Sequence, residues 1–194
     1  MSVIRAFIAI ELSADIRRSL DQLSSQLRQS LKGAPVRWVP ADNIHLTLKF
    51  LGNVSLTNLD ILKEVIQNEV TRHPAFEFSV GELGAFPSVR RPRVIVVRVQ
   101  APAELGQIQR GLEEGSRRLG YDPEERPFSP HLTLGRVSRN ASNSEVGQLG
   151  QALESTRIGF LGAMQVTSVH LFRSDLQPSG AIYTSLLSAQ LKSG

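Results

Sequence analysis

Two histidine-containing tetrapeptides are the residues of this chain best suited to chemistry. The sequence His45-Leu46-Thr47-Leu48 recurs letter for letter at His131-Leu132-Thr133-Leu134. With only four histidines and seven threonines in 194 residues, chance rarely produces even one His-x-Thr triplet. The repetition therefore indicates an internal duplication.

Each motif would place an imidazole and a hydroxyl side by side. Successive side chains of a β-strand point to opposite faces, so the histidine and threonine of each motif share the face away from its leucines. An unperturbed imidazole titrates near pH 6.5, so one histidine can act as a base while the other, protonated, acts as an acid. Phosphodiester cleavage needs both, because a nucleophile loses a proton and a leaving oxygen gains one. The threonine hydroxyls can donate to the phosphoryl oxygens.

A metal site is the alternative use of the histidines. It would take His45, His131 and His170 as ligands, but no further His, Asp or Glu lies at a typical ligand spacing within either motif. Chemistry without a metal or another cofactor is therefore favoured. His170 shares a strand face with Ser168 and Phe172, a pattern more typical of a structural histidine.

The composition is that of a globular protein with a moderate excess of positive charge. Hydrophobic residues make up 41% of the chain, the formal net charge is +4, and 18 of the 22 cations are arginines. Arginine suits phosphate oxygens, yet a charge this modest also serves solubility alone. The cations Arg90, Arg91 and Arg93 lie near Phe86, which fits either a rim for a nucleic acid or a solvated loop.

Several classes of protein are excluded. The chain has no cysteine, which rules out disulfides, cysteine-based zinc sites and a thiol nucleophile. Its apolar runs, such as 7–10 and 94–97, are far shorter than the roughly 20 residues that a membrane-spanning helix requires. The N-terminal segment lacks the features of a secretory signal, so we expect a cytoplasmic protein that does not enter a membrane.

The hydrophobic pattern predicts alternating strands and helices. The first helix should be capped by Ser13, and the second should begin near Thr57 with Asp60 as its capping partner. Strands are predicted at 4–12, 36–39, 44–51, 76–83, 93–99, 131–137, 158–161, 164–173 and 182–191, and helices at 14–31, 57–73, 103–119 and 145–154.

No low-complexity linker divides the chain. We therefore expect residues 1–194 to form one domain of two interlocked, pseudo-symmetric α/β lobes with a soft boundary near residue 100. Each lobe should expose one motif strand to a shared cleft.

The motif contexts, 39–52 and 126–136, resemble the 2H phosphoesterase superfamily, and within it the bacterial and archaeal RNA 2′,3′-cyclic phosphodiesterases, also called 2′-5′ RNA ligases. Segments 5–10, 86–94 and 174–183 are similar to that family too, so the resemblance covers nearly the whole chain. It implies an α+β, bilobal 2H phosphoesterase fold in which antiparallel sheets line a central cleft.

The resemblance also implies an activity and its residues. The activity is hydrolysis of RNA 2′,3′-cyclic phosphate to a 2′-phosphate without a cofactor. The implied roles are proton donor to the 3′ oxygen for His45, base for His131, phosphate binding for Thr47, Thr133 and Arg136, and nucleobase stacking for Phe50.

Phe50 and Arg136 carry a structural condition. Strict alternation from the histidines turns both side chains to the opposite face, so each requires a bulge or a strand end after Leu48 and after Leu134. Gly135 makes such a bend easier at the second motif. Without a bulge after Leu48, Phe50 is a core aromatic.

The predicted partner is RNA with a 2′,3′-cyclic phosphate end, which includes tRNA fragments or cyclic nucleotides, and the protein should be a monomer. Two alternatives stay open. One is a 2′-5′ ligase that joins tRNA halves with the same groups in reverse. The other is a non-catalytic module that binds RNA ends, although binding alone does not require two titrating groups.

Overall fold

The computed structural model describes residues 3–178 and 180–192. In chain order the elements are β1 (Val3–Ile10), α1 (Ala14–Ser30), β2 (Val36–Trp38), η1 (Ala41–Asn43), β3 (Leu46–Ser55), η2 (Leu56–Asn58), α2 (Leu59–Val70), β4 (Phe76–Ser88), β5 (Arg91–Gln100), α3 (Ala103–Arg118), β6 (His131–Val137), α4 (Asn143–Ser155), β7 (Gly162–Val166), β8 (Ser168–Gln177) and β9 (Gly180–Gln190).

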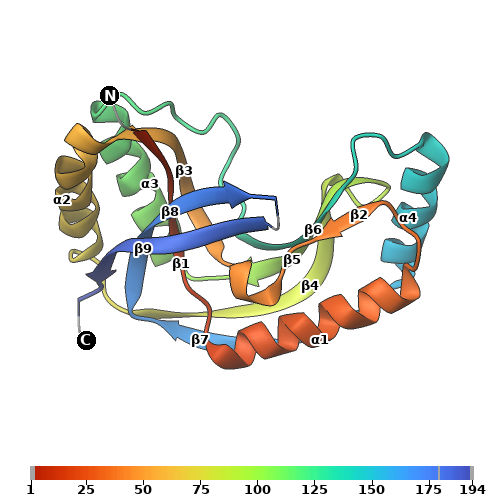
Figure 1. Ribbon diagram of the computed structural model, residues 1–194. Helices are drawn as coiled ribbons and strands as arrows, with labels where there is room; N and C mark the ends of the chain where they lie inside the picture. The colour runs from red at the N-terminus through yellow and green to blue at the C-terminus, as the bar shows by residue number, and fades with distance from the viewer. Residues whose placement is uncertain (1–2, 179, 193–194) are drawn as a thin grey trace.

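The strands form two antiparallel sheets. Sheet A has the order β3-β1-β8-β9 and sheet B the order β2-β6-β5-β4-β7. Helices α2 and α3 pack on sheet A, whereas α1 and α4 pack on sheet B (Figure 1). The bilobal α+β fold expected from the sequence is therefore present, with one motif strand, β3 or β6, in each sheet.

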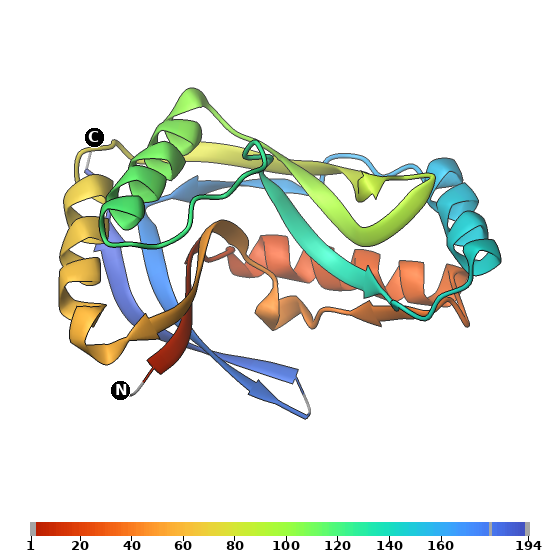
Figure 2. The same ribbon diagram turned by 90° about the horizontal axis from the view of Figure 1, so that it is seen from above.

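Both sheets draw strands from both halves of the chain. Sheet A joins the early strands β1 and β3 to the late strands β8 and β9, and sheet B combines β4 with β6 and β7. The chain moves from one sheet to the other at Thr167, between β7 and β8. Seen from above, the two sheets lie side by side (Figure 2). Along the chain, strands of the two sheets are intermixed. No cut near residue 100 separates them.

The first helix follows the sequence prediction closely. Ser13 caps α1 by accepting a hydrogen bond from the backbone of Ile16, at 3.3 Å. The stripe Ile16, Leu20, Leu23 and Leu27 is buried, as the helical spacing requires. The predicted cap at Thr57 is wrong. The side chain of Ser55 caps the 3-10 turn η2, and α2 begins only after this turn, at Leu59.

Three strand predictions need correction. The expected loop 84–92 is the end of a hairpin, in which Phe86 pairs with Val94 and the ladder continues to Ser88 and Arg91. Segment 158–161 is not a strand, and 164–173 is split between two sheets at Thr167. Proline, glycine and arginine favoured a loop at 84–92, and the apolar pattern favoured strands in the other two segments. Only a neighbouring strand decides where a ladder begins and ends.

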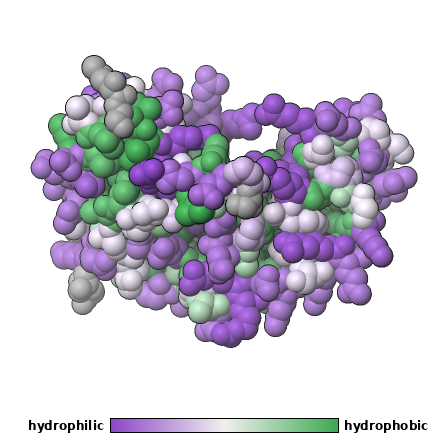
Figure 3. Space-filling view, in the orientation of Figure 1, coloured by the Kyte–Doolittle hydropathy of each residue, from purple (hydrophilic) through white to green (hydrophobic). Residues whose placement is uncertain are grey.

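The core lies between the sheets and their helices. The motif leucines Leu46, Leu48, Leu132 and Leu134 belong to one buried cluster that spans both sheets. A second, smaller cluster of Phe7, Ala9 and Phe172 lies on the other face of sheet A. In the space-filling view the surface is notched between the two lobes, with mostly hydrophilic side chains at its edge (Figure 3). Within the described ranges, no helix is long and apolar enough to span a bilayer.

Candidate active site

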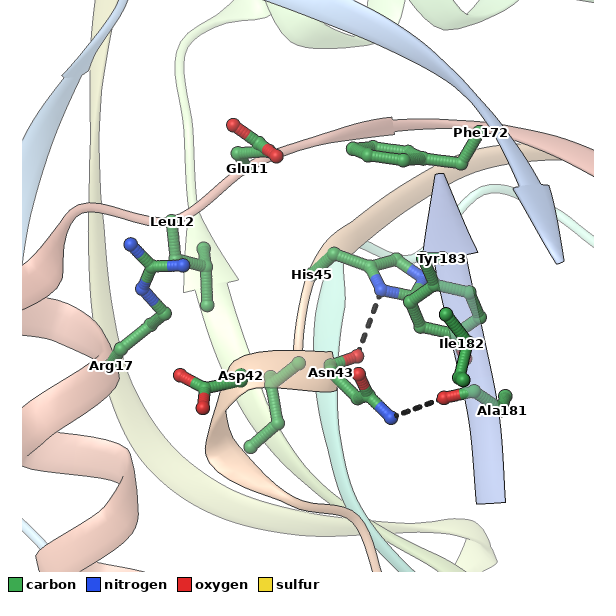
Figure 4. A pocket seen from close by; sticks show the side chains of 11 residues that line it. Glu11, Leu12, Arg17, Asp42, Asn43, His45, Phe172, Ala181, Ile182 and Tyr183 are labelled. Carbon is green, nitrogen blue, oxygen red and sulfur yellow. Dashed lines mark hydrogen bonds between the residues drawn. The ribbon is translucent and has the colours of Figure 1, made fainter. Parts of the chain in front are cut away.

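The first motif histidine is held by a turn that is tied to sheet A. His45 lies one residue before β3, immediately after η1 and Ile44, rather than inside the strand. Its Nδ1 is 2.9 Å from the carbonyl oxygen of Asn43. The side-chain amide of Asn43 donates in turn to the carbonyl of Ala181 on β9, at 2.9 Å (Figure 4). The imidazole is therefore held by hydrogen bonds that link the turn before β3, one edge strand of sheet A, to β9, the other edge strand.

The second motif histidine is oriented in the same way. His131 is the first residue of β6, and its Nδ1 is 2.7 Å from the carbonyl oxygen of Ser129, again two residues earlier. Because a carbonyl oxygen only accepts, Nδ1 of each ring must be the donor. Each neutral imidazole then has its lone pair on Nε2, which makes no hydrogen bond within residues 3–178 and 180–192.

The two imidazoles differ in their surroundings. His45 stacks on Phe7, with ring centroids 4.6 Å apart, and Tyr183 meets it edge-on at 5.3 Å. Burial among these rings lowers the pKa of His45 to about 4, although its hydrogen bond to Asn43 acts in the opposite direction. His131 instead meets the edge of Phe86, at 4.9 Å.

The motif threonines lie on the same faces as the histidines. Thr47 is the ladder partner of Ala9, which belongs to the small cluster on the cleft side of sheet A. Thr133 is the partner of Val96 on β5, and both threonines are half-buried. With the leucines in the main core, the alternation predicted within each motif is present.

A bulge follows each motif at the same position. Thr47 pairs with Ala9 and Lys49 with Ile8, so Leu48 is an extra residue in β3. In sheet B, Thr133 pairs with Val96 and Gly135 with Ile95, so Leu134 is the extra residue in β6. One inserted residue reverses the faces of all that follow. Both bulges that Phe50 and Arg136 require are therefore present.

The first bulge turns Phe50 outward. Phe50 is 63% exposed, and its ring lies 6.3 Å from that of Phe7, the residue that stacks on His45. The interpretation of Phe50 as a core aromatic is therefore wrong. Arg136, after the second bulge, is exposed as well.

A cavity of about 260 Å³ opens beside His45 (Figure 4). Phe172 and Tyr183 contribute to its wall, and its rim carries the charged residues Glu11, Arg17 and Asp42. His131 is not among its lining residues. Burial raises the pKa of the Tyr183 phenol, and the positive charge of Arg136 partly opposes this rise. The two motif strands, β3 and β6, contact each other.

The other candidates occupy different places. Arg90 pairs with Glu154 of α4 at 3.2 Å, and Arg93 donates to a backbone carbonyl at 3.4 Å, so both are engaged within the protein. His170 stacks on Phe172 at 5.6 Å and contacts Ser168 at 3.0 Å. In the part of the chain that the structure describes, no three His, Asp or Glu side chains are grouped to hold a metal ion.

The sequence did not single out Phe7, Phe172 or Tyr183, which surround His45. The sequence indicated the strands that carry these residues. However, β1 is apolar on both of its faces. Nothing local to such a strand tells which face packs in the main core and which lines a cleft.

Comparison with known proteins is consistent with this site. The model of the family "LigT like Phosphoesterase" matches the chain twice, over residues 10–96 and 97–183. An RNA 2′,3′-cyclic phosphodiesterase of Methanothermobacter thermautotrophicus is 33% identical over 183 residues, which is 94% of this chain and 96% of that protein.

Solved structures show the same fold. A Thermus thermophilus protein superimposes with a TM-score of 0.81 at 25% identity, covering 98% of this chain and 99% of that one. Escherichia coli LigT complexed with 3′-AMP superimposes with a TM-score of 0.76 at 29% identity, with coverages of 98% and 99%. Each of the two matched repeats contains one of the His-x-Thr motifs.

Proposed function

The chain belongs to the LigT-like phosphoesterases, and we propose that it hydrolyses the 2′,3′-cyclic phosphate at the end of RNA to a 2′-phosphate. The curated relative named above, at 33% identity over nearly the full length of both chains, carries that activity in its name. The enzyme is thus an RNA 2′,3′-cyclic phosphodiesterase, and His45 and His131 are its proposed proton-transfer groups.

The matched orientation of the two imidazoles carries this proposal. Each Nδ1 donates to the carbonyl two residues earlier, at 2.9 Å for His45 and 2.7 Å for His131. This bond fixes the tautomer and leaves Nε2 as the atom that accepts or donates a proton. Two histidines held only for structure would not need the same free nitrogen.

In the proposed reaction, water attacks phosphorus opposite the 3′ oxygen. Nε2 of His131 takes a proton from the water as the new P–O bond forms. The bond from phosphorus to the 3′ oxygen breaks, and Nε2–H of His45 protonates that oxygen. The phosphate remains on the 2′ oxygen. Exchange with solvent then returns a proton to His45 and removes one from His131.

Because the pKa of His45 is low, its imidazole must take up a proton from solvent when the anionic substrate binds. In the free protein the imidazole is neutral above about pH 4. A phosphate anion bound at Nε2 raises the pKa of an adjacent histidine, and opposite charges at this range shift pKa values by about 1–3 units. Substrate binding is therefore the event that makes His45 an acid.

The remaining site residues serve the phosphate and the base. Thr47 and Thr133 lie on the faces of their motif histidines, where their hydroxyls can donate to non-bridging oxygens. Arg136 adds positive charge from the strand that carries His131. Phe50 offers an exposed ring on which a nucleobase can stack, next to Phe7, which itself stacks on His45.

The same groups run the reverse reaction when an RNA hydroxyl replaces water, so 2′-5′ ligation of tRNA halves is the second candidate. Which direction prevails depends on the concentrations of water and of RNA ends. We propose that the partners are RNA ends, including tRNA fragments and cyclic nucleotides, and that the protein works as a cytoplasmic monomer, because each chain carries both motifs.

The test is turnover of adenosine 2′,3′-cyclic phosphate, with the product identified by phosphorus NMR. We expect 2′-AMP as the product. The variants His45→Ala and His131→Ala should each lose about 10²-fold to 10⁴-fold in turnover, the usual contribution of a positioned proton-transfer group. The double variant should lose far less than the product of the two factors.

His73→Gln is the matched control, because His73 bonds Glu69 at the end of α2 and takes no part in the site. It should retain normal turnover. An inactive wild type that still binds 2′-AMP would instead indicate a binding module. A 3′-phosphate as the sole product would mean that the substrate lies in the cleft the other way round.

A further inference from the structure

Two arginines face each other on neighbouring strands of sheet B. Arg37 of β2 and Arg136 of β6 are direct ladder partners, and both are exposed. Side chains at such positions share a face with Cβ atoms about 4.5–5.5 Å apart, and like charges placed there destabilise the sheet. Two positive charges placed in this way favour the binding of an anion near both guanidinium groups.

The opposite face of β2 shows that Arg37 points toward the cleft. A Cβ at Gly135 would come within 2.7 Å of Val36 and 3.2 Å of Trp38, so these two side chains cover Gly135 on the other face. Arg28 of α1 lies over the Trp38 ring, at 5.9 Å, so Val36 and Trp38 are on the face of sheet B that α1 covers. Arg37, between Val36 and Trp38 in the strand, must project the other way.

The ion pairing of Arg37 and Arg136 differs from that of other arginines in the protein. Other arginines of the protein, such as Arg98 and Arg173, are paired with acidic side chains. Within residues 3–178 and 180–192, none of the ion pairs includes Arg37 or Arg136. The charges of both act on Tyr183 across the cleft, together with that of Arg5 on β1, two residues before Phe7.

We propose that Arg37 forms a second anion site, which binds the 5′-phosphate of the terminal nucleotide, and that its ladder partner Arg136 contacts both this phosphate and the cyclic phosphate. This inference rests on the proposed function and extends it to the substrate. The cyclic phosphate occupies the motif residues and the base lies toward Phe50, so the 5′-phosphate is the one further anion of that nucleotide. Arg37 lies one strand, about 5 Å, beyond the strand of Thr133.

The site therefore selects RNA ends over free cyclic nucleosides. A 2′,3′-cyclic nucleoside phosphate has no 5′-phosphate and leaves the arginine pair unpaired. Two sources supply the missing anion, namely the phosphodiester of a longer RNA and the 5′-monophosphate of a single nucleotide. Both present non-bridging oxygens, which a pair of guanidinium groups binds through charge-assisted hydrogen bonds.

The experiment compares three substrates that differ only at the 5′ position. They are adenosine 2′,3′-cyclic phosphate, the same compound with a 5′-monophosphate, and the dinucleotide ApA with a terminal 2′,3′-cyclic phosphate. We expect kcat/KM to be about 10-fold higher for the two 5′-phosphorylated substrates, the value of one charge-assisted hydrogen bond. An advantage for only one of them identifies the source of the anion.

The decisive variant is Arg37→Gln, which should reduce that 10-fold preference toward one. Added salt should reduce the preference in the wild type but not in the variant. Arg110→Gln is the control, since Arg110 is an exposed cation on α3, on the outer side of sheet A, and this variant should keep the full preference.

Two outcomes would overturn the inference. One is equal kcat/KM for all three substrates in the wild type, and the other is an Arg37→Gln variant that slows all three by the same factor. Binding separates this result from a failure of the proposed function. If no substrate turns over, adenosine 2′,5′-bisphosphate should still bind about 10-fold more tightly than 2′-AMP to the wild type and not to Arg37→Gln.

Discussion

The imidazole of His45 lies flat against the ring of Phe7, with their planes inclined by 24°. Phe7 is 4% exposed and is itself stacked on Phe172, so one side of the imidazole is closed to water. The other motif histidine, His131, meets the edge of Phe86 instead. The duplicated motif thus places two chemically identical side chains in two different environments, which is the condition for separate acid and base roles.

This contact should make folding depend on pH. Burial lowers the pKa of His45 to about 4, whereas an unfolded histidine titrates near 6.5. Between these values the unfolded chain binds the proton more tightly, so stability should fall as the pH decreases from 6.5 to 4, by at most about 3 kcal/mol. Urea unfolding of the wild type and of His45→Gln at pH 7 and pH 4 measures this. The same loss in both proteins would contradict it.

The sequence predicted the parts of the site that depend on local pattern. Alternation around His45 and His131 correctly placed the threonines beside them and the leucines in the core, because strand geometry alone determines those faces. It also stated the condition for Phe50, a bulge after Leu48. Whether the bulge exists depends on how β3 pairs with β1, and pairing register is a property of two strands rather than one.

The rest of the site required the three-dimensional fold. Tyr183 reaches His45 only because the last strand pairs into the sheet of the first motif. The opposition of Arg37 and Arg136 likewise arises from the short strand β2 pairing with β6, more than ninety residues later in the chain. No local periodicity encodes contacts at that separation.

Phe50 should contribute binding and not chemistry. Stacking on a base is worth about 1–3 kcal/mol, so Phe50→Ala should raise KM for adenosine 2′,3′-cyclic phosphate about 10-fold and change kcat little. Phe160→Ala is the control, because Phe160 is exposed to a similar extent, at 74%, and lies outside the site. A Phe50→Ala variant with unchanged KM would remove Phe50 from substrate binding.

A buried ion pair behind the site should be important for stability. Nζ of Lys49 lies 2.9 Å from Glu113 of α3 and 2.8 Å from the carbonyl of Asp122, with 2% of the lysine side chain exposed. Removing one partner leaves a buried charge uncompensated, so Lys49→Met should cost about 3–5 kcal/mol in urea unfolding.

The paired replacement tests that reason. Lys49→Met combined with Glu113→Leu removes both charges and should recover much of the loss. Lys63→Met is the matched control, because Lys63 pairs with the exposed Asp60 at 3.4 Å and should cost less than about 1 kcal/mol. A double variant as unstable as Lys49→Met would show that packing, and not charge, is responsible.

Activity should survive exhaustive treatment with a chelator. In the proposed reaction both protons move through imidazoles, and the phosphoryl charge is stabilised by hydroxyl and guanidinium groups. Turnover before and after dialysis against EDTA measures this. If activity were lost and a divalent ion restored it, Glu11 and Asp42, the carboxylates that line the cavity beside His45, would be the first ligands to replace.

The pH dependence of the two histidine variants should identify the acid. In the wild type, kcat/KM for the cyclic nucleotide should follow a bell, because one imidazole must be neutral while the other is protonated, and its two apparent pKa values belong to the pair. The acidic limb should lie near pH 4, where free His45 titrates. The bell by itself has the same shape whichever histidine is the acid, so only the variants assign the roles.

If His45 is the proton donor, the residual activity of His45→Ala depends only on a neutral base. It should rise with pH to a plateau, and the fall at high pH should disappear. His131→Ala should retain only its requirement for a protonated His45, so its activity should decline as the pH increases. The opposite pair of profiles, a falling His45→Ala and a rising His131→Ala, would exchange the two roles. It would make the desolvated histidine on Phe7 the base that activates water.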